Sequence, residues 1–288
     1  MNPTGKTFSL WTQHGALNSK PVFDAFAHGA KSLGHNIVWN DSNSDVDVIW
    51  SVLWHGRMAS NKAIWERNMA QSKPTIVLEV GGIKRGTTWK VGLNGINRTA
   101  YFGDSGNDNT RANSLGLGCK PWKSDGNFIL ICGQHEKSLQ WQGMPTVSQW
   151  IMKVIDNIQR YSNRSIIFRP HPRCPLPHIE HEFKNVIRQD PKHVVGTYDD
   201  FDMSFNNIHA TISYSSNPGI HSVLEGVPAF VGPASLAYDA ANNIDFLHEI
   251  ENPLTPDRTQ WLNDYAWTEF TLEEISQGLP IKRLTKHI

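Results

Sequence analysis

The chain has 288 residues, of which 39% are hydrophobic and 19% charged, and its 27 Lys and Arg balance 27 Asp and Glu. This composition excludes a disordered chain, and the zero net charge excludes a strongly basic protein that coats nucleic acid regardless of sequence. No apolar run reaches the roughly 18 residues of a membrane span, and the first residues lack the pattern of a signal peptide. The three cysteines form no CxxC motif, which argues against a disulfide framework or a cysteine-rich zinc site and favours a reducing compartment. Together with the missing membrane span, this predicts a soluble, cytoplasmic protein.

In the first part of the chain, short apolar runs alternate with longer amphipathic stretches. We expect strands at 7–11, 36–39, 46–54 and 75–80, and helices at 21–33 and 58–70. This alternation is typical of βαβ units and of a mostly parallel sheet.

Residues 103–127 are rich in Gly, Asn, Asp and Ser and indicate a connection between two domains. A second alternation follows. We expect strands at 128–132, 165–169, 209–214 and 228–231, helices at 145–161 and 217–225, and one or two helices in the tail. The predicted fold is α/β, with two facing Rossmann-like domains at 1–122 and 123–255, a cleft between them and a helical tail at 256–288.

The segment Arg169-Pro170-His171-Pro172-Arg173 directly follows a predicted strand. Its two prolines keep the loop extended, and its arginines suit the oxygens of a phosphate. Ligands in such folds bind at the carboxyl ends of strands, which favours an anion site here. The alternative is a surface loop with scattered charge.

A second predicted anion site lies at Ser213-Tyr214-Ser215-Ser216-Asn217-Pro218-Gly219, where a strand ends and a helix begins. The backbone N–H groups and the dipole of a helix start favour a diphosphate. Gly133 and Gln134, on the loop after the strand expected at 128–132, are further candidate residues for this binding site. Glu225, further along the helix, could accept both hydroxyls of a ribose or could be an ordinary helix-end residue.

The RPHPR loop and the following SYSSNPGIHSVLEGVPAFVGPASLAYD resemble the C-terminal half of GT-B glycosyltransferases, most of all the capsule Kdo-transferase and teichoic-acid glycerophosphotransferase group. The resemblance spans Arg169 to Asp239. It implies a nucleotide-sugar donor, with UDP as the common nucleotide, and a tail that crosses back onto the N-terminal domain. It implies donor phosphate contacts from four residues, His171, Arg173, Ser215 and Ser216. This chain departs from the capsule enzymes because it is short and lacks a membrane-association signal.

The N-terminal half is then expected to bind the acceptor and to supply a general base. Its motifs WTQHG, WSVLWHGRM and EVGGIKRGTTWK each lie where a predicted strand ends. The candidate bases are Glu79, His14 and Asp104, although Glu79 could instead pair with Arg57. The candidate acceptor-binding residues are His55, Arg57, Lys84, Arg85 and Trp89.

The N-terminal motifs and the later segment WLNDYAWTEFTLEEI resemble uncharacterised proteins of tailed bacteriophages. The resemblance implies an enzyme of the host cytoplasm that glycosylates 5-hydroxymethylcytosine or another hydroxymethylated pyrimidine in duplex DNA, which requires extrusion of the base. The alternatives are a transferase acting on a cell-surface glycan, a non-catalytic protein that binds sugar-nucleotides or DNA, and a nucleotide-sugar epimerase.

Three histidines, His171, His178 and His181, lie close together in the sequence. No further ligand has a fixed spacing to them, and the resemblance implies no essential metal, so we expect no metal site. The absence of GxGxxG after the first strand makes an NAD-dependent enzyme a weak alternative, and the absence of GxxxxGK[ST] excludes a typical P-loop kinase.

Overall fold

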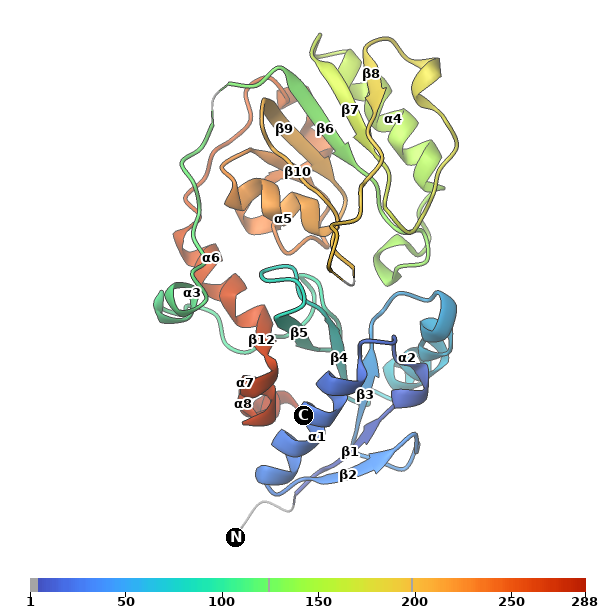
Figure 1. The fold of residues 1–288 in the computed structure, drawn as a ribbon, viewed down its shortest axis with the longest axis vertical. Coiled ribbons are helices and arrows are strands. Elements are labelled where there is room, and N and C mark those ends of the chain that lie inside the picture. The colour runs from blue at the N-terminus through green and yellow to red at the C-terminus, as the bar shows by residue number, and fades with distance from the viewer. Residues whose placement is uncertain (1–4, 124, 198) are drawn as a thin grey trace. The chain divides into compact units, whose positions relative to one another are not determined.

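The computed structural model describes residues 5–123, 125–197 and 199–288 (Figure 1). The chain forms two compact units. Unit 1 consists of Met1–Arg111 and Asn263–Ile288, and unit 2 consists of Ala112–Leu262. Among the described residues, every helix is too short or too polar to cross a bilayer.

Unit 1 contains a six-stranded sheet in the order β12-β5-β4-β3-β1-β2. Strands β1, β2, β3 and β4 are parallel to one another. Strand β5 runs antiparallel to β4, and β12 runs antiparallel to β5. The strands are β1 (Thr7–Leu10), β2 (Asn36–Trp39), β3 (Val46–Trp50), β4 (Thr75–Val80), β5 (Thr88–Leu93) and β12 (Glu269–Thr271). The helices are α1 (Lys20–Ser32), α2 (Asn61–Ala70), α7 (Leu272–Ser276) and α8 (Leu279–Leu284), and α3 (Thr110–Ser114) spans the boundary with unit 2.

One face of this sheet carries the main apolar core of unit 1. Phe26 of α1 meets Phe8 of β1 with ring centroids 5.8 Å apart, and Phe23 meets Trp50 of β3 at 6.3 Å. All four side chains are at most 1% exposed. Burial of a side chain of this size contributes about 1.5–3 kcal/mol, so this contact fixes α1 on the sheet.

Unit 2 contains a six-stranded parallel sheet in the order β11-β10-β9-β6-β7-β8. Counted within the unit, this is the doubly wound order 6-5-4-1-2-3. The strands are β6 (Phe128–Cys132), β7 (Ser165–Arg169), β8 (Val186–Arg188), β9 (Ile208–Ser213), β10 (Ala229–Val231) and β11 (Asn242–Asn243). The helices are α4 (Val147–Gln159) and α5 (Asn217–Leu224), and α6 (Thr259–Tyr265) spans the boundary with unit 1.

Helix α4 illustrates why these residues form a helix. Thr146 and Gln149 form a reciprocal capping box at its start, which satisfies two backbone N–H groups. Ile151, Ile155 and Ile158 recur at helical spacing and are fully buried in the core of unit 2. The cap and the apolar stripe thus favour the same element.

The predicted α/β class is confirmed, and most expected elements exist. The strand expected at 46–54 ends at Trp50, because Ser51 has a φ of +65°, which no continuing strand allows. The tail was expected to be helical, but it contains β12 before α7. Strands β5, β8 and β11 were not expected.

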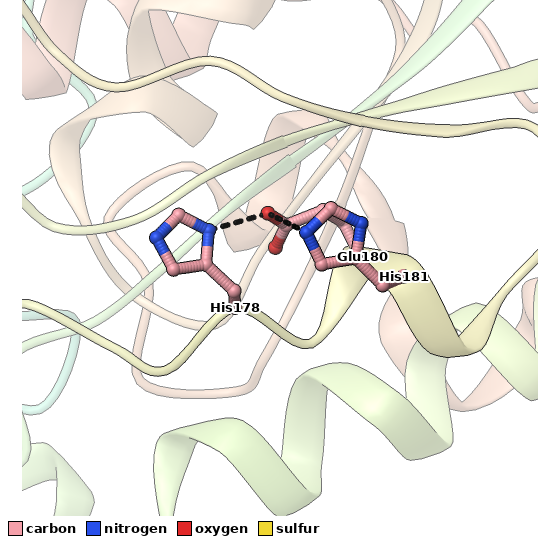
Figure 2. Close-up of side chains that lie close together, drawn as sticks. All are labelled: His178, Glu180 and His181. Atoms are coloured by element: carbon pink, nitrogen blue, oxygen red, sulfur yellow. Dashed lines mark hydrogen bonds and ion pairs between the residues drawn. The ribbon is translucent and has the colours of Figure 1, made fainter.

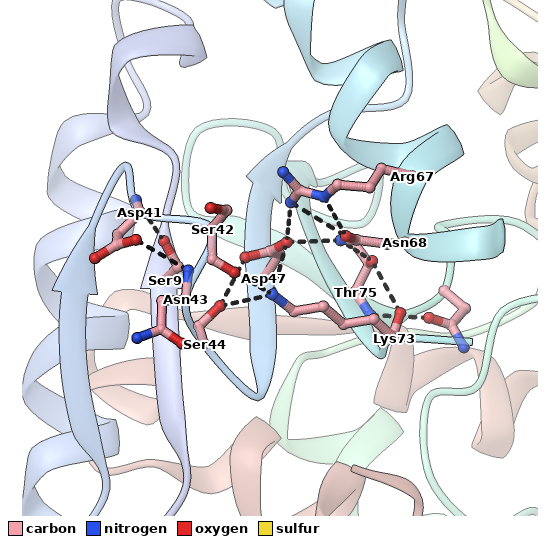
Figure 3. A network of polar contacts seen from close by, with 11 residues as sticks. Ser9, Asp41, Ser42, Asn43, Ser44, Asp47, Arg67, Asn68, Lys73 and Thr75 are labelled. Carbon is pink, nitrogen blue, oxygen red and sulfur yellow. Dashed lines mark hydrogen bonds and ion pairs between the residues drawn. The ribbon is translucent and has the colours of Figure 1, made fainter. Parts of the chain in front are cut away.

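A buried carboxylate organises the α2-facing side of the unit 1 sheet (Figure 3). Asp47 of β3 is 0% exposed. Its oxygens lie 2.6 Å from Arg67 Nη2, 2.8 Å from Asn68 Nδ2, 2.9 Å from Ser44 Oγ and 3.2 Å from Lys73 Nζ. The network ties β3 to α2 and to the loops on either side.

The charge state of Asp47 depends on this network. Burial alone would raise the pKa of Asp47, but hydrogen bonds from neighbours such as Asn68 and the charge of Lys73 outweigh it and hold the pKa below its usual value. A carboxyl with a depressed folded pKa adds stability above its unfolded pKa of about 3.9 and loses that stability as pH falls through the folded value.

We expect Asp47→Ala to lower the free energy of unfolding by about 2–4 kcal/mol at neutral pH, because two cations and Asn68 lose their shared acceptor. Urea denaturation measures this difference. The difference should shrink as pH falls below the unfolded pKa of about 3.9, toward the lower pKa of the folded carboxyl. Asp24→Ala, which removes an exposed partner of Lys20, is the control and should have little effect. An equal loss at neutral and at acidic pH would contradict the assignment.

Candidate functional site

In unit 2 the strand order reverses between β6 and β9, which are neighbours in the sheet. The chain goes from β6 to β7 on one side and from β9 to β10 on the other, so the loops after these strands diverge. In open parallel sheets, ligands bind at such a switch point, beyond the carboxyl ends of the strands. Here the loops are 133–135 and 214–216.

Gln134 joins these two loops. Its Oε1 accepts hydrogen bonds from Ser215 N at 3.3 Å and Ser215 Oγ at 3.2 Å, and its Nε2 donates to Ser138 Oγ at 3.1 Å. Gln134 is 6% exposed and Ser215 8%. Because both ends of the amide are engaged, the side chain holds the two loops at a fixed separation.

Helix α5 begins directly after the second loop. Ser216 occupies its N-cap position, but the side chain caps no N–H of the helix. Its hydroxyl instead lies 2.9 Å from Ser213 Oγ and donates to Gly133 O at 3.4 Å. The first turn therefore has no side-chain cap, and Asn217 is its first residue. Such a helix start favours an anion through its N–H groups and its dipole.

Two histidines lie beside this switch point. His135 follows β6 and His171 follows β7, and their rings meet edge to face with centroids 5.3 Å apart. A Cβ at Gly133 would lie only 3.0 Å from His171 N, so glycine allows this close approach. Nδ1 of His171 accepts from Arg173 N at 3.1 Å, which assigns the proton of the neutral ring to Nε2.

The structure places Arg169 differently from the sequence expectation. Arg169 is 4% exposed and donates to the carbonyl oxygen of Asp202 and, at 2.8 Å, to Asp202 Oδ1. Arg173 is about half exposed and pairs with Asp199 at 2.7 Å. Both arginines thus have carboxylate partners in the same loop. This arrangement favours a structural role for Arg169 and leaves Arg173 as the more accessible cation.

Glu225 lies just after α5, at the opposite end from Ser216. Its carboxylate forms a partly exposed ion pair with Lys120 Nζ at 2.6 Å. The predicted contact between Glu225 and a ribose therefore requires competition with this pair.

In unit 1 a charged row crosses the sheet near the end of β4. Glu79 of β4 is directly opposite Lys90 of β5, and Lys90 is directly opposite Glu269 of β12. Directly paired residues share one face, so the three charges alternate in sign along it. Lys90 is 4% exposed and Glu269 0%. Lys90 is thus flanked by two carboxylates.

Glu269 also holds the loop after β4. Its carboxylate accepts from Gly82 N at 2.6 Å, from Ile83 N at 2.9 Å and from Thr88 Oγ1 at 2.7 Å. The loop that carries Lys84 and Arg85 is therefore fixed by a side chain from a distant part of the sequence.

Burial shifts the titration of this row. It raises the pKa of Glu79, and a hydrogen bond from Ser51 and the charges of Lys90 and Arg85 offset only part of this effect. Burial also lowers the pKa of Lys90, against the opposing charges of Glu269 and Glu79. A carboxyl whose pKa is raised toward neutrality is suited to accept a proton.

Asn61 connects the loops after β1 and β3. It is 0% exposed, and its Nδ2 donates to Trp50 O at 2.6 Å and to His14 O at 3.3 Å. The ring of His14 stacks on Trp11 with centroids 6.2 Å apart, and burial lowers the pKa of His14. A neutral imidazole can act as a base, which keeps His14 as a candidate.

Two other predicted residues lie elsewhere. Trp89 faces away from Lys90 into the apolar core and is 7% exposed, a position that does not favour acceptor contact. Asp104 pairs with Lys286 Nζ at 2.5 Å and accepts from Tyr101. Tyr101 bridges to Leu93, beside the start of β4, whereas Glu79 lies near its end. Of the remaining candidates, the side chains of His55, Arg57, Lys84 and Arg85 are all exposed.

Neither the models of known protein families nor the sequences of curated proteins match the chain. Among solved structures, the β-Kdo 2,7 transferase of Thermosulfurimonas dismutans KpsC matches with a TM-score of 0.52 and 14% identity, over 96% of this chain and 99% of that one. The chain has the GT-B fold. The β-Kdo 2,4 transferase of the same protein has a TM-score of 0.49 and 10% identity, over 91% and 89% of the chains. A Methanocaldococcus jannaschii UDP-GlcNAc 2-epimerase has a TM-score of 0.38 and 11% identity, over 97% of this chain and 99% of that one.

Sequence reasoning missed three residues of these sites: Lys90, Glu269 and His135. Lys90, a single Lys among the apolar residues of β5, was a weak sign of a buried charge. Its partner Glu269 could not be predicted, because only the pairing of β12 with β5 brings the two residues together. His135 stood next to Gln134, and only the approach of His171 distinguishes it.

We expect Arg169→Ala to lower the free energy of unfolding by about 2–3 kcal/mol, because a nearly buried side chain and its bonds to Asp202 are lost. Arg173→Ala should change it by less than about 1 kcal/mol, since that pair is half exposed. Urea denaturation of the two variants gives the comparison. Equal losses would contradict the different roles assigned to the two arginines.

Proposed function

We propose that the chain is a glycosyltransferase that uses a nucleotide-sugar donor bound by unit 2. The observation that carries the proposal is the bridge from Gln134 to Ser215 across the switch point of a GT-B fold. It fixes an anion-favouring helix start beside two histidine-bearing loops. This geometry suits the diphosphate of an activated sugar.

In this proposal the donor diphosphate lies at the start of α5. Backbone N–H groups of the first turn and the Nε2–H of His171 donate to its oxygens, and Arg173 adds positive charge. As the bond between the sugar and the diphosphate breaks, the leaving group gains negative charge, which these groups stabilise. UDP is the first nucleotide to test, and we expect no essential metal.

Glu79 is the proposed base. As the acceptor oxygen bonds to the anomeric carbon, the proton of its hydroxyl passes to the Glu79 carboxylate. The raised pKa of Glu79 makes its carboxylate a stronger base than an ordinary carboxylate. His14 is the second candidate.

The proposed acceptor is the hydroxymethyl group of a modified pyrimidine in duplex DNA. Exposed Arg57, Lys84 and Arg85 follow β3 and β4 and could contact phosphates. A cell-surface glycan is the second candidate, favoured by the likeness of the fold to a Kdo transferase.

A transfer assay tests donor and acceptor together. A panel of nucleotide-sugars is offered with duplex DNA that contains 5-hydroxymethylcytosine or 5-hydroxymethyluracil, and the digested nucleosides are measured by mass spectrometry. We expect the mass of one pentose or hexose to be added to the modified base. Duplex DNA with unmodified pyrimidines is the control. Donor binding without transfer to DNA would contradict the DNA acceptor and favour the glycan, and no binding of any donor would overturn the proposed function.

We expect Glu79→Gln to reduce kcat by roughly 10²–10⁴-fold with donor affinity unchanged, because the amide accepts no proton from the acceptor. The kcat of the wild type should rise with pH through a pKa above the ordinary Glu value of about 4.3, since the base acts when ionised. Glu66→Gln, at an exposed position on α2, is the matched control. A kcat of Glu79→Gln close to that of the wild type would move the base to His14.

A further inference from the structure

A cluster outside the proposed sugar site combines two histidines and a glutamate. It lies in the connection from β7 to β8, within the segment His178-Ile179-Glu180-His181, which we call the HxEH segment (Figure 2). The side chains of His178 and His181 are 68% and 79% exposed, whereas Glu180 is 8% exposed. The segment thus presents two accessible imidazoles on either side of a buried carboxylate.

The donor atoms of this cluster converge. Nδ1 of His178 lies 2.6 Å from Glu180 Oε1, and Nε2 of His181 lies 3.7 Å from the same oxygen. All three ligand atoms lie within 4.8 Å of one another. In a tetrahedral site with bonds of about 2.1 Å, ligand atoms are roughly 3.4 Å apart. The two separations from Glu180 Oε1, 2.6 and 3.7 Å, lie on either side of that spacing, and both rings are exposed.

The backbone of the HxEH segment is anchored. Ile179 is 4% exposed and lies in the core of unit 2, and Leu176 and Phe183 pack against the same core. The chain on both sides of the cluster is therefore held in place, which limits the entropy lost when a ligand orders the two rings.

Glu180 is fixed and incompletely satisfied. Its Oε2 is buried and makes no hydrogen bond, and the nearest cation is Arg188 Nη1 at 3.8 Å. Arg188 itself donates to Leu176 O and Pro177 O and pairs with Asp190 Oδ1 at 2.8 Å, so its charge is shared. Because Oε1 faces both imidazoles, a cation held by the two rings would also gain from the charge of this carboxylate.

We propose that the HxEH segment binds one divalent transition-metal ion, of the Zn²⁺ type, through His178 Nδ1, Glu180 Oε1 and His181 Nε2. Two imidazoles and a carboxylate are a donor set suited to Zn²⁺ and its neighbours, whereas Mg²⁺ and Ca²⁺ prefer oxygen ligands. Because three protein ligands leave one tetrahedral position open and the histidines are exposed, water completes the site. The ion would link three residues within the connection from β7 to β8. This proposal does not depend on the proposed sugar transfer.

The test uses the full chain without a histidine tag, stripped of metal by a chelator. Calorimetric titration with Zn²⁺ should give one ion per chain, and Co²⁺ should give the visible absorption of tetrahedral coordination, which Zn²⁺ then abolishes. We expect His178→Ala and His181→Ala each to weaken Zn²⁺ binding by at least about tenfold and to lose the Co²⁺ bands. Both residues are exposed, so both variants should fold.

His248→Ala is the matched control, because His248 is another exposed histidine beside a glutamate, at 3.4 Å from Glu249, in the described chain. It should bind Zn²⁺ as the wild type does. Glu180→Gln, which keeps the shape of the side chain, should weaken binding as the histidine variants do. Fewer than one ion per wild-type chain, or wild-type affinity in both histidine variants, would overturn the proposal.

Discussion

The reversal of strand order between β6 and β9 is the constraint on which the arrangement of unit 2 depends. Two parallel strands lie side by side there, but their following loops leave in opposite directions, which leaves a gap beyond the strand ends. The side chain of Gln134 fills part of that gap by accepting twice from Ser215. The position of α5 and the approach of His171 to Gly133 follow from the same meeting of loops.

Several charged residues of both units are paired with residues that are distant in the sequence. In unit 2, the loop containing Asp199 and Asp202 engages both arginines of the RPHPR segment. The stiffness of that segment thus comes from these ion pairs as well as from its prolines. In unit 1, Lys90 is buried because a carboxylate lies on each side of it. Breaking such an arrangement at one member leaves an uncompensated charge, which is the costly change.

The parts of the fold that the sequence predicted are those with a local signal. The run Thr75–Val80 and the amphipathic stretch that became α4 each carry the period of their own element. Strand β12 was mistaken for helix because its three residues carry too short a pattern, and pairing with β5 decides its conformation. Trp89 looked like a surface aromatic, although the alternation of a strand turns it to the opposite face from Lys90. Loop positions such as Gln134 were predicted because they directly follow predicted strands. Ion-pair partners were not predicted, because residues that are distant in the sequence but close in the fold show no common sequence pattern.

Glu269 has a consequence for the order in which the chain folds during synthesis. It is 181 residues from Thr88, whose hydroxyl it binds, and the whole of unit 2 lies between them. A nascent chain therefore completes unit 2 before β12 can join the sheet of unit 1. Until then the N–H groups of Gly82 and Ile83 lack the Glu269 carboxylate, and Thr88, Trp89 and Lys90 of β5 lack their neighbouring strand. Unit 1 is begun first but completed second, and in the interval its uncovered strand edge is open to pairing with other chains.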